Sequence, residues 1–213
     1  EWGIELPFDP KYVCYVWFDA LINYITGIGY PDGPDFESFW GACNHLVGKD
    51  ILKPHAIFWP IMLKTMGLPV YQHLNVHGYW SVDGRKIFKS LGNMVSPIAM
   101  KERYGFDAFR YFLLREMVFG LDSDFSEVAL IRRINADLAN NLGNLARRIE
   151  TIGSRAGHVP QIEDTPAAPE GYHEAMEDIR FNDALASLWR LATALNQRIE
   201  DVKPWELQKR GED

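Results

Sequence analysis

The chain has 213 residues, a net charge of −7 and 47% apolar residues, which is the composition of an ordinary globular protein with a real core. No apolar run approaches the ~20 residues that a membrane-spanning helix needs. Its two cysteines, Cys14 and Cys43, lie outside any C-x-x-C pair, which excludes a cysteine-rich zinc site. No metal site is predicted, and a reducing cytoplasm is the expected compartment.

The first 120 residues alternate between strand and helix patterns. The apolar, β-branched run at 12–18 predicts a strand buried on both faces. Residues 45–48 and 74–79 predict two more strands, and residues 55–66 between them have helical spacing that ends at Gly67. A strand, a helix and a strand within ~30 residues imply parallel pairing of the two strands.

The chain then turns at Asp83-Gly84. Ser96-Pro97 predicts the start of a short helix that Gly105 ends, because serine caps helices and proline favours the first helical position. Asp107 is expected to cap another helix that runs to about Phe119.

From Ser126 onward only helices are predicted. Ser126 is expected to cap a long helix that reaches Ile152 and ends at Gly153, because its apolar residues recur every three or four positions. Further helices are expected at 174–180, at 182–199 and from Lys203-Pro204-Trp205. The predicted architecture is therefore α/β over residues 1–120 and an all-α bundle over residues 121–213.

Three strands are few for an open doubly wound sheet. The sequence is therefore expected to hold the rear half of such a domain, with the other strands supplied by sequence before Glu1.

Several polar residues follow the predicted strands. Lys86 and Lys89, in the run Lys86-Ile87-Phe88-Lys89-Ser90, provide positive charge of the kind that phosphoryl transfer needs. Asp50 in Gly48-Lys49-Asp50 could accept a hydrogen bond from a ribose hydroxyl, and His77-Gly78 permits close approach of a flat ring. Each signal alone also fits a solvated turn, a helix cap or a strand end.

Charge alone leaves nucleic-acid binding open. The net negative charge argues weakly against it, whereas the segment from Arg85 to Arg115 holds seven basic residues. A solvated helix surface explains these residues equally well.

Taken in order, the motifs resemble the methionyl-tRNA synthetase family, over roughly residues 1–207. The resemblance is carried by Tyr15-Val16-Trp17-Phe18-Asp19-Ala20, Val47-Gly48-Lys49-Asp50-Ile51, Phe58-Trp59-Pro60, Val76-His77-Gly78-Tyr79, Lys86-x-x-Lys89-Ser90, Asn135-Ala136-Asp137-Leu138, Asn144-Leu145-Ala146-Arg147-Arg148 and Lys203-Pro204-Trp205. Each motif is modest, and the ordered set is specific.

The resemblance implies a role for each matched residue. The methionine pocket would be lined by Trp17, Ala20, Tyr24, Ile51 and His55. ATP would be bound by Gly48, Asp50, His77, Gly78, Lys89 and Ser90, with Lys86 and Lys89 as the catalytic lysines of the K-M-S-K-S signature loop. The CAU anticodon of tRNA(Met) would be read by Asn144, Arg148 and Trp205.

The resemblance also implies the reaction and its partners, which are methionine, ATP with Mg²⁺, and tRNA(Met). Two departures from the motifs of the family limit the resemblance. The signature loop has Ile87-Phe88 in place of Met-Ser, and the H-I-G-H signature of the family does not occur in the sequence. We therefore expect the 213 residues alone not to form methionyl-adenylate.

Two other functions compete with a ligase fragment. One is a catalytically inactive module that binds tRNA through anticodon recognition alone. The other is a related synthetase for leucine, isoleucine or valine, against which the aromatic residues Trp17 and Tyr24 argue, because a branched aliphatic substrate has less use for an aromatic wall.

Overall fold

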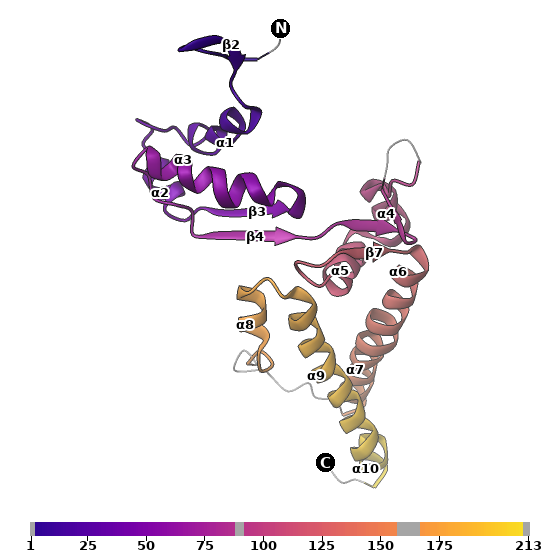
Figure 1. The fold of residues 1–213 in the computed structure, drawn as a ribbon. Coiled ribbons are helices and arrows are strands. Elements are labelled where there is room, and N and C mark those ends of the chain that lie inside the picture. The colour runs from indigo at the N-terminus through magenta and orange to yellow at the C-terminus, as the bar shows by residue number, and fades with distance from the viewer. Residues whose placement is uncertain (1–2, 88–91, 157–166, 211–213) are drawn as a thin grey trace. The chain divides into compact units, whose positions relative to one another are not determined.

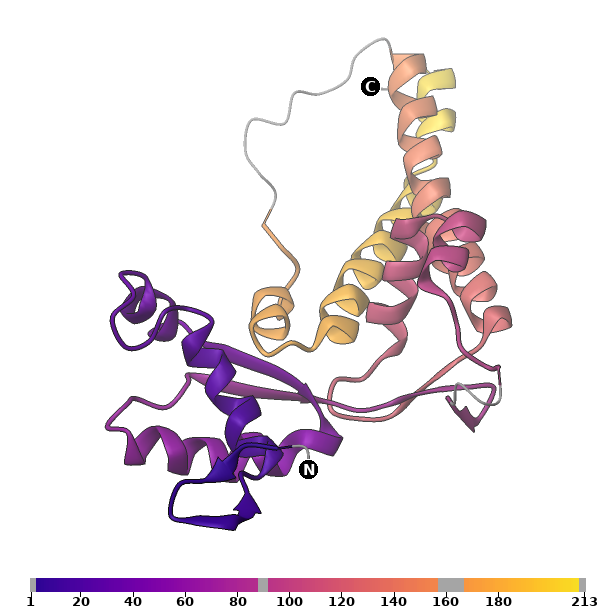
Figure 2. The same ribbon diagram turned by 90° about the horizontal axis from the view of Figure 1, so that it is seen from above.

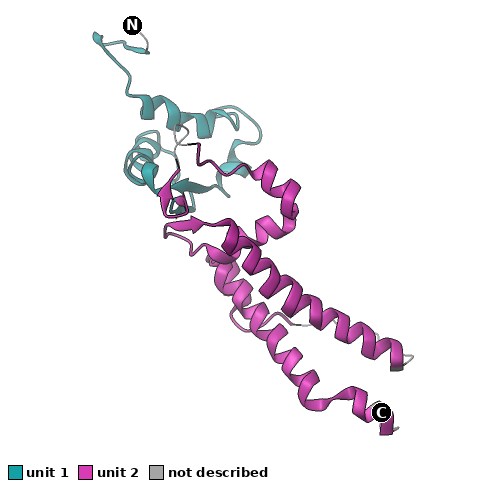
Figure 3. Cartoon of the chain, turned by 90° about the vertical axis from the view of Figure 1, so that its right-hand side faces the viewer, with its two compact units in different colours: residues 1–79 teal, residues 80–213 magenta. Residues whose placement is uncertain are grey.

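The computed structural model describes residues 3–87, 92–156 and 167–210. The chain forms two compact units, residues 1–79 and residues 80–213 (Figure 3). The predicted functional boundary near residue 120 lies inside the second unit and stays a prediction. Among the described residues, no helix is both long and apolar enough to cross a membrane.

The first unit is built around two parallel strands. Its regular elements are β1 (Glu5–Leu6), β2 (Asp9–Val13), α1 (Val16–Thr26), α2 (Phe36–Trp40), β3 (Asn44–Gly48), α3 (Trp59–Thr65) and β4 (His73–His77). Strands β3 and β4 pair in parallel from Asn44↔His73 to Gly48↔His77, as the sequence predicts. Helix α3 connects them and lies along the pair (Figure 1).

The predicted buried strand at 12–18 is wrong. Strand β2 ends at Val13, pairs antiparallel with β1 and is largely exposed, and helix α1 already begins at Val16. Leu21 and Ile25, four residues apart on α1, are the residues of this helix that enter the core. A short apolar run does not distinguish a buried strand from the first turn of a helix, and here the helical period further along decides.

The predicted helix at 55–66 is confirmed. It consists of a π-helical turn at Pro54–Phe58 followed by α3, and Gly67 adopts a φ of 74° just beyond its end. The core beneath it is aromatic and aliphatic, and its buried members are Leu21, Ile25, Phe36, Trp40, Trp59 and Leu63.

The second unit starts with a small sheet and continues as helices. Its elements are β5 (Trp80–Val82), β6 (Arg85–Lys86), α4 (Pro97–Tyr104), α5 (Phe106–Glu116), β7 (Ser123–Phe125), α6 (Glu127–Arg133), a π-helical segment (Ile134–Gly143), α7 (Asn144–Ala156), α8 (Tyr172–Glu177), α9 (Phe181–Val202) and α10 (Pro204–Arg210). Strand β5 pairs with β6 on one side and with β7 on the other.

The predicted turn at Asp83-Gly84 joins β5 to β6, and both residues have positive φ, 49° and 71°. The cap at Ser96 is also confirmed, because its hydroxyl accepts a hydrogen bond from the Ala99 amide at 3.3 Å. Strand β7 was not predicted, and it has only three residues.

Two predicted helix ends are corrected. Helix α5 begins at Phe106 after Gly105 and ends at Glu116, so Asp107 lies in its first turn and is not its cap. The long helix from Ser126 passes through Gly153 and ends at Ala156. One glycine inside a strongly amphipathic helix costs only about 1 kcal/mol, which packing of the apolar stripe offsets.

Helices α5 and α9 and the π-helical segment pack together (Figure 2). Asp137 joins the π-helical segment to α5 and α6 electrostatically. Its Oδ2 accepts a hydrogen bond from the Tyr111 hydroxyl at 2.5 Å and lies 3.4 Å from Arg133 Nη1. Burial, and then the bond to Asp137, raise the pKa of Tyr111, which keeps this phenol a proton donor. The Tyr111 ring meets Trp189 of α9 edge to face.

We expect Asp137→Asn to lower the free energy of unfolding by about 1–3 kcal/mol, because it removes a largely buried charge that two partners satisfy. Asp183→Asn is the matched control, since Asp183 pairs with Arg180 in a geometry open to solvent. Its expected cost is below about 1 kcal/mol. Chemical denaturation of both variants tests the difference, and equal losses would contradict the structural role of Asp137.

Candidate functional site

The first candidate site is built on two buried histidines. His55 lies in the π-helical turn before α3 and is fully buried, and His45 on β3 is 5% exposed. Their ring centroids are 5.6 Å apart. Tyr24 of α1 contacts both rings, at 4.6 Å from the His45 centroid and 5.6 Å from the His55 centroid.

Hydrogen bonds fix the proton position on each ring. His55 Nδ1 lies 2.8 Å from the Ile51 carbonyl, which can only accept, so Nδ1 carries the proton. The Tyr24 hydroxyl therefore donates to His55 Nε2, at 2.8 Å. In the same way the Trp59 indole donates to His45 Nε2 at 3.1 Å. His45 is thus held in the neutral form with the proton on Nδ1, because its Nε2 accepts from a group that can only donate.

The electrostatics agree with this arrangement. Burial, and then the neighbouring His55, lower the pKa of His45 from 6.5 to about 4. Burial, and then the Cys43 thiol, raise the pKa of Tyr24, so its hydroxyl remains a donor at neutral pH. The site can therefore present an uncharged, aromatic and polarizable surface.

The structure brings most of the expected methionine-binding residues together. The Trp17 ring packs edge to face on His55, with centroids 5.8 Å apart, and Tyr24 and Ile51 hydrogen-bond to the same histidine. Ala20 is exposed on α1. It lies three residues after Trp17 and four before Tyr24, a spacing that shares one helix face.

The expected ATP-binding residues of the first unit meet at the carboxyl ends of β3 and β4. Gly48 pairs with His77 in the strand register. A Cβ atom on Gly48 would lie 2.6 Å from Asp50 Oδ1 and 3.6 Å from His77 Cε1, so the three residues converge and a side chain at this position would displace the Asp50 carboxylate. Gly78 is buried, and its carbonyl lies 2.8 Å from His77 Nδ1. Lys49 Nζ lies 4.7 Å from the centre of the Tyr79 ring.

The signature-loop residues belong to the second unit. Lys86 ends β6 and is exposed. Lys89 and Ser90 lie outside the described residues. Their roles therefore remain predictions.

A polar groove of about 410 Å³ lies between the long helix and α9. Asn144 and Arg148, two of the three expected anticodon residues, line it together. Arg148 Nη2 pairs with Glu200 Oε1 at 2.6 Å, and Asn144 Nδ2 donates to the Asn140 carbonyl at 2.7 Å. Trp205 is half-buried on α10, which packs against α7 but does not line this groove.

Sequence reasoning missed several residues of the two sites. His45 gave no signal, because its partners come from other elements. The groove also contains Asn141, whose side chain donates to Thr193 at 3.0 Å and accepts from Asn196 at 3.0 Å. The amide-rich stretch from Asn140 to Asn144 inside an amphipathic helix was a usable signal.

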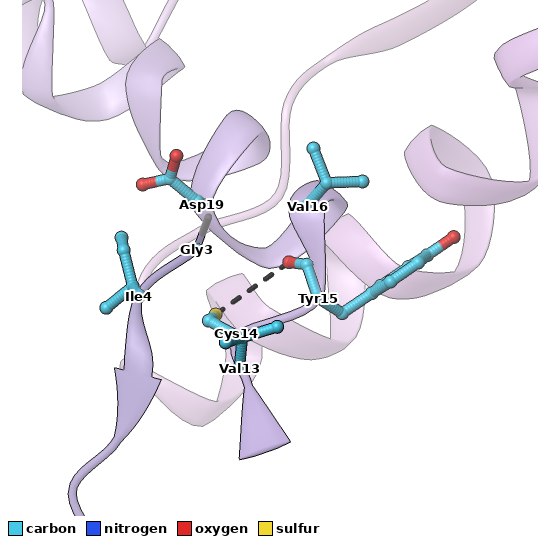
Figure 4. Close-up of a pocket in the computed structure, with 7 residues that line it drawn as sticks. All are labelled: Gly3, Ile4, Val13, Cys14, Tyr15, Val16 and Asp19. Carbon is cyan, nitrogen blue, oxygen red and sulfur yellow. Dashed lines mark hydrogen bonds between the residues drawn. The ribbon is translucent and has the colours of Figure 1, made fainter. Parts of the chain in front are cut away.

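A larger pocket, of about 790 Å³, opens where β1 and β2 meet the start of α1 (Figure 4). Its lining residues are Gly3, Ile4, Val13, Cys14, Tyr15, Val16 and Asp19. None of the predicted site residues lines it, because the sequence placed this segment inside a sheet. Apart from Asp19 the lining side chains carry no charge, so the pocket offers little to orient a ligand. Among the described side chains, no cluster of histidine, cysteine and carboxylate could hold a metal ion.

We expect stability to fall as the pH drops from 6.5 toward 4, because the unfolded chain then binds a proton at His45 that the folded chain excludes. The contribution of the neutral His45 to the free energy of unfolding is fully present above pH 6.5. Below that pH, the slope of this free energy against pH approaches about 1.4 kcal/mol per pH unit. His45→Gln keeps an acceptor for the Trp59 indole and should flatten this part of the curve. Urea denaturation across this range tests it, with His73→Gln on exposed β4 as the control; equal slopes in all three proteins would contradict the assignment.

Comparison with known proteins identifies the family of the chain. Residues 1–150 match the family model described as tRNA synthetases class I (M). The methionine–tRNA ligase of Caldanaerobacter subterraneus subsp. tengcongensis is 45% identical over 224 residues, covering 98% of this chain and 35% of that protein. The methionine–tRNA ligase of Thermotoga maritima is 42% identical over 229 residues, covering 99% and 36%. The chain thus spans about a third of the length of the curated relatives it matches.

Solved structures show the same relationship. The crystal structure of Mycobacterium tuberculosis methionyl-tRNA synthetase bound by methionyl-adenylate superposes with a TM-score of 0.82 and 38% identity, covering 98% of this chain and 44% of that one. The apo form of the same protein gives a TM-score of 0.79. The fold of class I aminoacyl-tRNA synthetases is therefore present, and the chain belongs to the methionyl-tRNA synthetase family.

Proposed function

We propose that the chain is the rear part of a methionine–tRNA ligase of protein synthesis, which activates methionine with ATP and transfers it to tRNA(Met) in the cytoplasm. Residues 1–120 would form the rear half of a Rossmann-type catalytic domain and residues 121–213 an anticodon-binding bundle. The observation that supports it most is the convergence of Trp17, Tyr24 and His55 beside the strand that carries Gly48.

Methionine would bind against the aromatic wall of the first unit. A thioether sulfur gains from contact with aromatic rings, which Trp17 and Tyr24 supply. The hydrogen bond between the Tyr24 hydroxyl and His55 Nε2, at 2.8 Å, fixes the orientation of the Tyr24 ring. A wall without net charge binds an uncharged thioether with no desolvated ion to compensate.

ATP would bind across the carboxyl ends of β3 and β4. Asp50 would accept hydrogen bonds from the ribose, and His77 with Gly78 would lie beside adenine. Because Gly48 has no side chain, the Asp50 carboxylate can lie directly over the strand end. Mg²⁺ would accompany the ATP phosphates, as it usually does in nucleotide sites.

The reaction needs positioned charge and no protein nucleophile. The methionine carboxylate attacks the α-phosphate in line, the bond to the β-phosphate breaks, and methionyl-adenylate and pyrophosphate form. A hydroxyl at the tRNA 3′ end then takes the methionyl group and releases AMP. Lys86 and Lys89 would stabilise the negative charge that develops on the phosphates.

Anticodon recognition would take place on the second unit. Asn144 and Arg148 present amide and guanidinium donors from one groove, and Trp205 offers a ring for stacking on an unpaired base. This groove is formed by the described residues of the second unit alone, which supports the second candidate, a tRNA-binding module without catalysis. The two candidates differ in whether residues 1–213 support adenylate formation in a complete enzyme.

A chimeric enzyme distinguishes the two candidate functions. Residues 1–213 would replace the matching segment of the Caldanaerobacter ligase, and we expect methionine-dependent exchange of pyrophosphate into ATP. Lys89→Ala should lower kcat about 10²–10³-fold, because one charge that stabilises the transition state is lost. Lys64→Ala, at an exposed position of α3, is the matched control. The isolated 213 residues should show no exchange.

Exchange that depends on leucine, isoleucine or valine would contradict the methionine assignment. Clear exchange by the isolated chain would contradict its catalytic incompleteness. An inactive chimera whose second unit still binds tRNA would support the binding-module candidate.

Anticodon binding is testable on the isolated chain. We expect Trp205→Ala to weaken binding of tRNA(Met) roughly 5- to 150-fold, because stacking on one base contributes about 1–3 kcal/mol. Trp205→Phe should keep most of the affinity, since it keeps an aromatic face. Arg148→Gln should also weaken binding, whereas Arg147→Gln, on the exposed neighbour, should not. Fluorescence titration with tRNA of cognate and altered anticodon measures this, and indifference to the anticodon would refute the assignment.

A further inference from the structure

The carboxylate of Asp124, which the proposed chemistry does not use, forms hydrogen bonds with the hairpin that carries Lys86. Its Oδ1 accepts a hydrogen bond from the Ser81 hydroxyl at 2.5 Å and another from the Gly84 amide at 2.8 Å. One oxygen thus reaches both the strand β5 and the turn that follows it. The Asp83 amide adds a bond to the Phe125 carbonyl at 3.1 Å, so β7 holds the turn through side chain and backbone together.

The strand register connects these hydrogen bonds of Asp124 to Lys86. Ser81 lies opposite Asp124 on one side and opposite Lys86 on the other. The turn between them has two residues with positive φ, Asp83 and Gly84, and the ladder beyond the turn is only two residues long. So short a hairpin is marginal by itself and depends on contacts from outside its ladder.

Another hydrogen bond holds Lys86 from its other side. The Asn93 side chain donates a hydrogen bond to the Lys86 carbonyl at 3.0 Å. The backbone of Lys86 is thereby held on one side by its pairing with β5, where Asp124 fixes the turn. It is held on the other side by Asn93. Asp124 is the one charged group in these hydrogen bonds, and a carboxylate accepts more strongly than a neutral oxygen.

We propose that Asp124 is a positioning residue of the adenylation reaction, which fixes the β5–β6 hairpin and through it the place of Lys86 at the nucleotide phosphates. This inference rests on the proposed function. Asp124 itself is exposed, so its loss should change the global stability little and the local order of the hairpin greatly.

The first test uses the isolated chain and no catalysis. Opening of the hairpin should speed tryptic cleavage after Lys86, so the cleavage rate reports its local order. We expect Asp124→Ala to speed this cleavage at least about tenfold with little change in Tm. Asp124→Asn keeps the accepting oxygen and should stay near the wild-type rate. Asp107→Ala, an exposed carboxylate on α5, is the control.

The second test uses the chimera with the Caldanaerobacter ligase. We expect Asp124→Ala to lower kcat of pyrophosphate exchange at least about tenfold while the KM for methionine stays within about twofold, because the aromatic wall belongs to the other unit. Asp124→Asn should restore most of kcat. A purely structural role would instead lower Tm and change both parameters.

Three results would overturn the proposal: unchanged cleavage after Lys86 in Asp124→Ala, unchanged kcat in the same variant, or an Asp124→Asn variant as defective as Asp124→Ala. If Asp124→Ala does not fold, Ser81→Ala replaces it, and cleavage no faster than wild type then overturns the proposal. An inactive unsubstituted chimera refutes the proposed function, whereas the proteolysis result still decides whether Asp124 orders Lys86.

Discussion

The first unit depends on one constraint, which is that His45 must be buried without charge beside a second histidine. His45 and His55 face each other at 5.6 Å, and burial together with the neighbouring ring lowers the pKa of His45. The protein meets this constraint with a hydrogen bond from the Trp59 indole to Nε2 of His45, while the Tyr24 hydroxyl bonds to Nε2 of His55. These partners come from α3 and α1, so the same bonds fix α3 on β3 and α1 on the π-helical turn.

The constraint also shapes the candidate methionine site. Tyr24 and Trp17 are oriented by His55, which is itself held by the Ile51 carbonyl just beyond β3. The Tyr71 hydroxyl, 2.9 Å from the His55 carbonyl, ties the backbone of this turn to the segment before β4. An aromatic wall built on such shared bonds moves little when a ligand arrives, which lowers the ordering cost of binding. Core stability and ligand recognition here use the same side chains.

The sequence predicted what local patterns determine. The parallel pairing of β3 and β4 followed from a helical pattern of suitable length between two short strands, and the convergence of Gly48 with His77 followed from that pairing. The buried strand predicted at 12–18 was wrong, because seven apolar residues in a row carry no period. His45 and Asn196 could not be found at all: their partners, Trp59 and Asn141, are distant in sequence, and only the packed fold brings them together.

In the second unit the π-helical segment places two kinds of contact within one turn of helix. Asp137 bonds to Tyr111 of α5, and Asn141, four residues later, bonds to Thr193 and Asn196 of α9. A π-helix is wider than an α-helix and is rarely kept without a reason, and here it allows one stretch of backbone to serve both neighbours. Helix α6, which leads into this segment, starts three residues after Asp124. Strand β7, which holds the Lys86 hairpin, and the long helix that lines the polar groove are therefore consecutive in the chain. A displacement of either must be absorbed at the short junction around Ser126.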